Sequence, residues 1–350
     1  MDSITTIGLD IAKNVFQLHG VDESGAVILR RSLRRGQMLA FFGNLPPCLI
    51  GMEACATAHH WARTLLALGH DVRLIPPAYV KPYLRRQKND AADAAAICEA
   101  VTRPSMRFVP VKSEEQQATL MLHGARELLV SQRTALINAL RGHFAEFGIV
   151  VAQGARNARL LVAIIHDERD MDLSASARLA LLPLATALID VEAEIAKLSK
   201  AILVAHRSSD VSVRLATIPG IGPIVASCLA ASIADAGVFK SGRELAAFLG
   251  LVPKQHSTGG KPRLGRITKM GNRRLRKLLV VGAHAALYSI KSGKTNTPLA
   301  DWARSLLAKK PFKLVAVALA NKMARIAWVI MTRNTVYKPA FGGAGPQAAS

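Results

Sequence analysis

Hydrophobic and turn-forming residues alternate along the first part of the chain. Runs of β-favouring residues predict three short strands over residues 3–9, 14–21 and 26–33. Residues 22–25 read Asp-Glu-Ser-Gly and predict a hairpin turn between the second and third strands. The chain is therefore expected to open with a three-stranded meander.

The next four elements alternate between helix and strand. They are predicted over residues 36–44 (helix), 48–52 (strand), 58–68 (helix) and 71–75 (strand). Two prolines directly after the last strand stop it. The order β-β-β-α-β-α-β is typical of a mixed sheet covered by helices, and it resembles the ribonuclease H-like α/β fold.

Helical signals dominate from about residue 91. Helices are expected over residues 91–102 and 114–147, and residues 113–211 are rich in Ala, Leu, Arg and Glu with few glycines. Residues 180–204 carry apolar side chains at helix or heptad spacing. This pattern predicts a helical hairpin or coiled-coil spacer that serves as a lever or an oligomer contact. From residue 212 onward, glycine-rich turns separate short helices in a segment dense in Lys and Arg.

These changes of pattern divide the chain into four expected parts. Half of the residues are hydrophobic, which supplies enough material for real cores. The last ten residues are rich in Gly, Ala and Pro, so a disordered tail is expected there. The parts are an α/β domain at 1–110, a helical spacer at 111–210, a mainly α basic domain at 211–340 and the tail at 341–350.

Net charge narrows the choice of partner. The chain carries a formal charge of +22 with a pI near 10.5, which favours a polyanion such as DNA or RNA, or an anionic membrane surface. No acidic residue lies between Glu244 and Asp301 or after Asp301, and a one-sign segment of this length suits a phosphate backbone. A spanning helix is not expected, because His284 interrupts one late apolar stretch and Lys322 and Arg325 interrupt another.

The N-terminus and the cysteines favour a cytoplasmic protein. The first ten residues include Asp2 and Asp10 and lack a basic region followed by an apolar one, so no signal peptide is predicted. The four cysteines form no CxxC pair and no Cys/His cluster, which argues against structural zinc and a disulfide framework. We expect reduced, mostly buried thiols.

Four carboxylates fall where the expected fold would bring them together. Asp10 ends the first strand, Glu53 follows a buried strand, and Asp90 and Asp93 share one face at the start of a helix. Phosphodiester chemistry uses two cations about 3.5 to 4 Å apart, and carboxylate oxygens hold Mg²⁺ or Mn²⁺. Simpler roles stay open for single residues, because Asp10 could close a turn and Asp90 could cap its helix.

Three blocks around these acids carry a family resemblance. Residues 8–13 (GLDIAK), 51–54 (GMEA) and 88–94 (KNDAADA) resemble the DEDD transposase domain of bacterial insertion sequences. That domain is similar to the RuvC-type Holliday-junction resolvases. The resemblance covers about the first 110 residues, and it implies that all four acids bind metal.

A short motif in the basic domain predicts a phosphate-binding corner. Residues 215–226 read as a helix, a tight turn and a second helix. Gly220 and Gly222 would expose backbone N–H groups at the start of the second helix, where anions bind. This arrangement resembles the helix-hairpin-helix element, which grips DNA phosphates without reading sequence. A corner between helices that binds nothing is the alternative.

The densest cationic stretch surrounds Ser257. A serine beside the glycine pair at 259–260 and several cations could attack a phosphodiester, because the cations favour its alkoxide and stabilise the transition state. An ordinary Ser-Thr-Gly-Gly turn is the alternative. Arginines in this loop suit bidentate phosphate contacts. The loop's cations are Lys254, Lys261, Arg263, Arg266, Lys269, Arg273, Arg274, Arg276 and Lys277.

This second region resembles the C-terminal transposase domain of the same family. The matching motifs are residues 219–222 (PGIG), 248–253 (FLGLVP) and 255–261 (QHSTGGK). Members are similar to RNA-guided recombinases, in which a bridge RNA pairs with donor and target DNA and a serine forms a covalent link to DNA. The resemblance implies Ser257 as nucleophile, with Thr258 as the alternative hydroxyl. Aromatic residues make up only 5% of the chain, so any RNA is expected to be held through its backbone and shape.

The sequence therefore predicts a bacterial, nucleoid-associated transposase or recombinase that uses Mg²⁺ or Mn²⁺. Donor DNA, target DNA and a guide RNA are the expected partners, and strand exchange implies a dimer or tetramer. One alternative is a metal-dependent RuvC-like junction nuclease that uses water. The other is a non-enzymatic helix-hairpin-helix DNA-binding protein. The residues expected to contact nucleic acid are Gly220, Gly222, Lys261, Arg263, Arg266, Lys269, Arg273 and Arg274.

Overall fold

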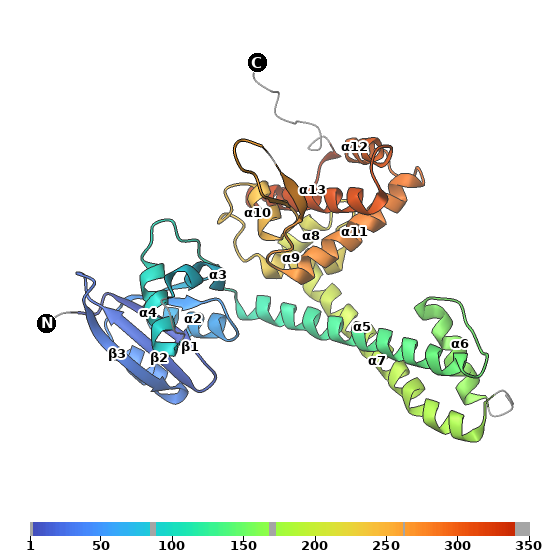
Figure 1. Ribbon diagram of the computed structural model, residues 1–350, viewed down its shortest axis with the longest axis horizontal. Helices are drawn as coiled ribbons and strands as arrows, with labels where there is room; N and C mark the ends of the chain where they lie inside the picture. Colours follow the sequence, from blue (N-terminus) through green and yellow to red (C-terminus); the bar gives the residue numbers. More distant parts are fainter. Residues whose placement is uncertain (1–2, 85–88, 168–172, 262, 340–350) are drawn as a thin grey trace, which may run out of the picture. The chain divides into compact units, whose positions relative to one another are not determined.

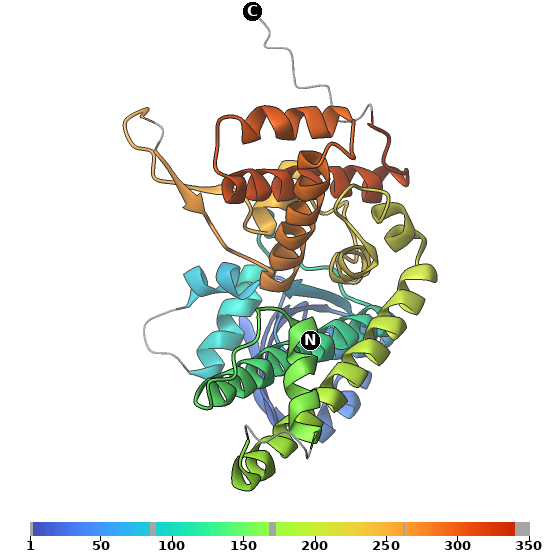
Figure 2. The same ribbon diagram turned by 90° about the vertical axis from the view of Figure 1, so that its right-hand side faces the viewer.

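A computed structural model of the protein describes residues 3–84, 89–167, 173–261 and 263–339 (Figures 1 and 2). The chain forms two compact units. The first contains Met1–Gln117 and Ser232–Lys240, and the second contains Ala118–Ala231 and Ser241–Ser350. The expected boundaries after residues 110, 210 and 340 stay predictions, and the expected disordered tail lies outside the described residues.

A five-stranded mixed sheet forms the centre of the first unit. Its order is β3-β2-β1-β4-β5. The first three strands pair antiparallel, as the predicted meander requires, and β1, β4 and β5 run parallel. The turn at residues 22–25 is confirmed, because the Asp22 side chain accepts hydrogen bonds from Ser24 Oγ and Ala26 N. The strands are β1 (Thr6–Ile11), β2 (Val15–Val21), β3 (Val27–Arg34), β4 (Leu49–Glu53) and β5 (Asp71–Ile75).

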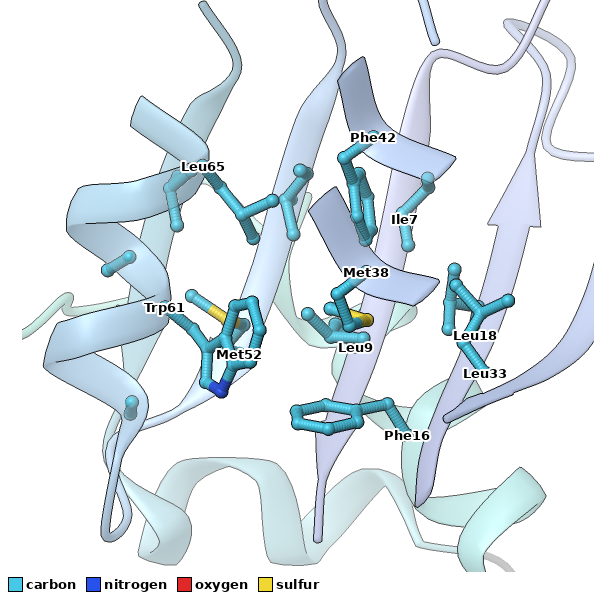
Figure 3. Close-up of a cluster of buried hydrophobic side chains, with 14 of the residues drawn as sticks. Ile7, Leu9, Phe16, Leu18, Leu33, Met38, Phe42, Met52, Trp61 and Leu65 are labelled. Atoms are coloured by element: carbon cyan, nitrogen blue, oxygen red, sulfur yellow. The ribbon is translucent and has the colours of Figure 1, made fainter. Parts of the chain in front are cut away.

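Apolar side chains fill one face of this sheet. Strand residues such as Ile7 and Leu9 pack against Phe42 of α1 and Trp61 of α2 (Figure 3). The predicted alternation of helix and strand is confirmed. The helical elements before the acidic helix are η1 (Arg35–Gln37), α1 (Met38–Gly43), α2 (Ala58–Ala67), α3 (Pro77–Val80) and η2 (Lys81–Tyr83).

The opposite face of the sheet carries helix α4 (Asp90–Val101). Successive strand residues point to opposite faces, so Gly8 and Gly51 face α4 while Ile7 and Leu9 face the apolar core. A Cβ atom on Gly8 would lie 2.0 Å from the Ala94 carbonyl oxygen of α4. The absence of side chains at these glycines therefore lets α4 lie directly on the strands.

Three helices form the extended middle of the chain. They are α5 (Glu114–Ala145), α6 (Ala155–His166) and α7 (Ala175–Arg207), which confirms the predicted helical composition. Their common core contains Leu140 and Phe144 of α5, Leu161 of α6 and Leu188 of α7. Burial of these side chains holds the hairpin together.

The C-terminal part is mainly helical, as expected. Helix α13 packs against α10 and α11 and buries Leu319, Ala320 and Met323 in the core. One departure from expectation is a two-stranded ribbon formed by β6 and β7. The elements are α8 (Asp210–Leu215), α9 (Pro223–Ser232), α10 (Gly242–Phe248), β6 (Pro253–Gln255), β7 (Leu264–Ile267), α11 (Arg273–Lys291), α12 (Pro298–Leu307) and α13 (Phe312–Arg333).

Helix α13 corrects the expectation that no helix is long and apolar enough to span a membrane. By length and by a mean hydropathy of 1.6, it is the one helix among the described residues that could cross a membrane. Lys322 and Arg325 do not lower the average enough to prevent this. The core helix of a soluble domain meets the same criterion, and eight residues of α13 are buried within its own unit.

Candidate active site and nucleic-acid-binding residues

Three of the four predicted acids converge. Ligand oxygens of Asp10, Asp90 and Asp93 all lie within 4.8 Å of one another, which makes them the group of the described residues best suited to hold a cation. Asp10 belongs to β1, and both other acids belong to the first turn of α4. The cluster thus joins residues that are 80 positions or more apart in the sequence.

Backbone geometry explains this convergence. Asp10 lies two residues after Gly8, so both point to the face of the sheet that α4 covers. The two acids of α4 are three residues apart and share one side of the helix. Asn89 caps α4 by accepting a 2.8 Å hydrogen bond from Ala92 N. The alternative roles fail, because Asp90 is not the cap and Asp10 lies inside a paired strand opposite Gln17.

Glu53 lies beside this cluster but outside the 4.8 Å group. Glu53 is the last residue of β4. Met52, the residue before it, pairs with Leu9 of β1, the residue before Asp10, so Glu53 and Asp10 lie at the same level of the sheet. The charges of Glu53 and Asp10 both affect the pKa of the nearby Cys55 thiol. Burial raises the pKa of the Cys55 thiol, and the charges of Glu53 and Asp10 raise it further. Glu53 therefore lies at the edge of the same negatively charged region.

The donor set fits a hard divalent cation. Asp10 and Asp93 are half-buried and Asp90 is exposed. Three carboxylates therefore lie close together in a partly buried position. Such carboxylates repel one another, and a bound cation relieves that repulsion. Carboxylate oxygens are the ligands that Mg²⁺, Mn²⁺ and Ca²⁺ prefer.

Ser257 lies in the second unit on an exposed β-ribbon. The expected loop is largely an antiparallel ribbon, because His256 N donates to Arg263 O and Lys261 N donates to Thr258 O, and the expected turn at the glycine pair closes its tip. The tip residues Gly259 and Gly260 have φ angles of +56° and +75°. Positive φ at both central residues is the geometry of a type I′ turn, which glycine adopts without strain.

The ribbon fixes the Ser257 hydroxyl. Its Oγ accepts hydrogen bonds from Gln255 Nε2 at 3.0 Å and from Arg263 N at 3.2 Å. Two donors on one oxygen stabilise the negative charge that this oxygen gains when it loses its proton. The hydroxyl is exposed, so a phosphodiester can reach it.

The predicted cations separate into two groups. Arg274 is half-buried and donates to Glu127 at 2.7 Å, Lys277 donates to the same carboxylate at 3.2 Å, and Arg276 donates to the carbonyls of Leu249 and Met270. The hydrogen bond from Arg274 lowers the pKa of Glu127. Arg274 is thus committed to packing of α11 against α5. The exposed group that is open to solvent comprises Lys254, Lys261, Arg263, Arg266, Lys269 and Arg273.

The two glycines of the predicted phosphate corner differ. The helix, turn and helix are present as α8 and α9. Gly220 has a φ of +87° and packs against α11, since a Cβ there would lie 2.8 Å from Gly282 O. A Cβ on Gly222 would meet no atom within 4 Å. Close packing of helices explains Gly220, and only Gly222 lies on an open surface.

Comparison with known proteins places both regions in one class. The profile of the DEDD transposases of the IS110 type matches residues 7–149. A second profile, described as "Transposase IS116/IS110/IS902 family", matches residues 212–297. The class is therefore that of transposases, enzymes that cut and join DNA.

Relatives along almost the whole length support the same assignment. A protein of Pseudomonas aeruginosa named "Probable family 20 transposase" is 50% identical over 96% of this chain and 99% of its own length. The transposases of the insertion sequence elements IS1328 of Yersinia enterocolitica and IS1111A of Coxiella burnetii are each 39% identical, over 96% and 97% of this chain and 99% and 92% of their own. The chain belongs to the IS110/IS116 family of insertion-sequence transposases. DNA is its substrate, and divalent metal is typical of its DEDD domain.

Proposed function

We propose that this transposase moves its insertion sequence by a serine-based exchange of DNA strands that is supported by metal-bound carboxylates. The observation that carries the proposal is the convergence of Asp10, Asp90 and Asp93 from two distant elements. Asp10 and the two acids of α4 would hold Mg²⁺ or Mn²⁺, and Glu53 would complete the set from β4. The sheet order and the helix on its acidic face support a ribonuclease H-like, RuvC-like fold for this domain.

When bound, the metal ions would stabilise charge on the oxygens of the reacting phosphodiester. The protein's own residues carry out the bond exchange. Ser257 Oγ gives its proton to water and attacks the phosphorus, an Oγ–P bond forms, one P–O bond to deoxyribose breaks, and the released oxygen takes up a proton from water. A hydroxyl of a second strand then attacks the same phosphorus, which restores Ser257 and joins the strands. One phosphoester replaces another at each step, so no external energy source is needed.

The exposed cations would hold the DNA around this chemistry. Lys261, Arg263 and Arg266 lie on the ribbon, and Lys269 and Arg273 follow it. Their side chains can neutralise phosphates, which fixes the DNA without reading its bases. Gly222 at the α8–α9 corner would add backbone N–H contacts of the helix-hairpin-helix kind.

Guidance by a bridge RNA is part of the proposal and rests on the resemblance of the C-terminal motifs. Exchange of two strands needs at least two active centres, so we propose a dimer or tetramer acting in the bacterial nucleoid. The division into residues 1–110, 111–210 and 211–340 would separate metal chemistry, spacing and serine chemistry.

Trapping of a covalent intermediate tests the serine step. Wild-type protein and a nicked DNA substrate that prevents rejoining should yield protein joined to a DNA end after denaturation, with the link mapped to Ser257 by mass spectrometry. Ser257→Ala should lose both the adduct and cleavage. Thr258→Ala serves as the matched hydroxyl control and should keep the adduct.

Three results would change the assignment. Cleavage by Ser257→Ala at the wild-type rate would refute the serine step and favour a nuclease that uses water. An adduct on Thr258 would keep the covalent reaction and move the nucleophile by one residue. Full strand transfer in EDTA would refute the metal-dependent part independently.

A further inference from the structure

A large groove in the second unit has no role in the chemistry described above, apart from Arg266, which the proposed function already assigns to DNA. Its volume is about 1090 Å³, and its wall is formed by one side of α13, the start of α10, part of the β6–β7 ribbon, Trp302 of α12 and residues 335–338. All of these segments belong to the same compact unit. The groove is therefore a feature of one body.

All of the charged residues that line the groove are cationic. Among its lining residues there is no Asp or Glu. Arg243, Arg266 and Arg325 are exposed, so their guanidinium groups can meet a ligand from solvent. Burial lowers the pKa of Lys322, and the charge of Arg325 lowers it further, as expected where cations crowd together. The lining cations are Arg243, Arg266, Lys322, Arg325 and Lys338.

The groove also gathers aromatic rings. Trp302 and Trp328 are two of the three tryptophans in a chain that is only 5% aromatic, and Tyr337 lies with them. The Lys322 ammonium lies 4.3 Å from the centre of the Trp302 ring. The Tyr337 hydroxyl is buried and has no hydrogen-bond partner among the described residues. Scarce aromatics are thus concentrated among cations.

Helix α13 explains why the groove exists. One side of this helix, with Leu319 and Met323, packs in the core. The other side presents Leu314, Ala318 and Arg325 to the groove at helical spacing. The apolar character that gives α13 its high mean hydropathy therefore serves two surfaces, the core and the floor of the groove.

We propose that this groove binds an unpaired nucleic-acid strand, with bases against the tryptophans and phosphates against the arginines. This inference rests on the proposed function only in that the ligand is nucleic acid. Aromatic side chains can stack only on bases that have left a double helix, whereas cations alone would also serve duplex DNA. A groove that combines rings, an apolar floor and a lining in which every charged residue is cationic matches the amphipathic chemistry of a single strand.

Binding measurements on the full-length protein test the proposal. The probes are fluorescein-labelled dT12, rU12, an abasic 12-mer and a 12-base-pair duplex. In a Trp61→Phe background, intrinsic fluorescence reports only Trp302 and Trp328. It should be quenched by dT12 or rU12 and not by the abasic strand, because only bases stack.

Two pairs of substitutions separate stacking from charge. Trp302→Leu with Trp328→Leu should weaken dT12 or rU12 binding about tenfold or more and leave duplex binding within about twofold. Arg243→Gln with Arg325→Gln should reduce the log-log salt slope for single strands by about 1.4, which is about 0.7 for each lost phosphate contact. Lys313→Gln with Arg333→Gln removes two exposed cations of α13 outside the groove and is the matched control.

Each outcome decides the question. Tighter binding of rU12 than dT12 would assign the groove to RNA, and equal or tighter binding of dT12 would assign it to a DNA strand. Unchanged strand affinity in both substituted pairs, or an equal loss for duplex, would overturn the proposal. Loss of self-association in the tryptophan pair, with strand binding intact, would instead assign the groove to a second copy. Ser257→Ala should bind strands normally, so failure of the serine step and failure of the groove are distinguishable.

Discussion

Substitution of Gly8 by Ala should damage the metal site without touching any of its ligands. A Cβ on Gly8 would lie 2.0 Å from Ala94 O and 2.4 Å from Cys98 N, both backbone atoms of α4. Ordinary contacts begin at 3.4 Å, so α4 must move away from β1 by about 1.4 Å. Overpacking of this kind costs about 1 to 3 kcal/mol of stability.

The same shift should weaken ion binding. Two oxygens on one Mg²⁺ ion are at most about 4.2 Å apart, because each Mg–O distance is about 2.1 Å. The cluster oxygens already span up to 4.8 Å, so small adjustments close the site and a displacement of α4 opens it. Asp10 would stay with β1 while Asp90 and Asp93 moved with the helix. We expect the Mg²⁺ requirement to rise about 10- to 100-fold, as for other disturbed metal surroundings.

Thermal unfolding and the Mg²⁺ concentration for half-maximal DNA cleavage measure the two effects. Gly43→Ala is the matched control, because a Cβ on Gly43 of α1 meets no atom within 4 Å. It should leave the Mg²⁺ requirement unchanged. A Gly8→Ala protein with wild-type melting temperature and wild-type Mg²⁺ requirement would refute the idea that contact between α4 and β1 positions the acids.

Three further predictions concern charge. Asp10→Asn should abolish metal-dependent cleavage while duplex binding stays within about twofold; activity that survives in EDTA would contradict this. Arg273→Ala should lower the log-log salt slope of duplex binding by about 0.9 and leave the melting temperature unchanged. Arg274→Ala should instead lower the free energy of unfolding by about 1 to 2 kcal/mol, because its ion pair with Glu127 is lost. Burial, then Arg274 and Arg126, lower the pKa of His123 to about 4, so the unfolded state takes up a proton first. The free energy of unfolding should therefore fall as pH drops from 6.5 to 4, by up to about 3 kcal/mol. Urea unfolding measured across this pH range should show a smaller fall for His123→Gln than for the wild-type protein.

The first unit was predictable because its signals are local. Alternating hydrophobicity and turn residues place β5 at the predicted residues 71–75 and the other strands within a few positions. The topology then follows from few choices, because meanders pair with themselves and crossovers give parallel strands. The acids were found for the same reason, since each marks the end of a strand or the start of a helix.

The second unit was less predictable because its sequence signals have several physical causes. The β6–β7 ribbon has exposed residues on both sides, so no apolar alternation announces it. Gly220 looks like a phosphate-binding glycine but packs against Gly282 from α11, and a local motif does not show that distant partner. Arg274 is one cation among nine in sequence, and only its contact with Glu127 makes it structural.

By itself, the sequence predicted the element order of the first unit, a polyanionic partner, the four candidate acids and the candidate serine, because these depend on local pattern and residue chemistry. Only the tertiary structure decided which residues meet. It joined Asp10 to Asp90 and Asp93 through the glycine contact under α4, and it left Glu53 at the edge of that group. It also gathered Trp302 and Trp328 from separate helices into one groove. Contacts between residues far apart in sequence depend on how whole helices and strands pack, and that packing leaves no local signal in the chain.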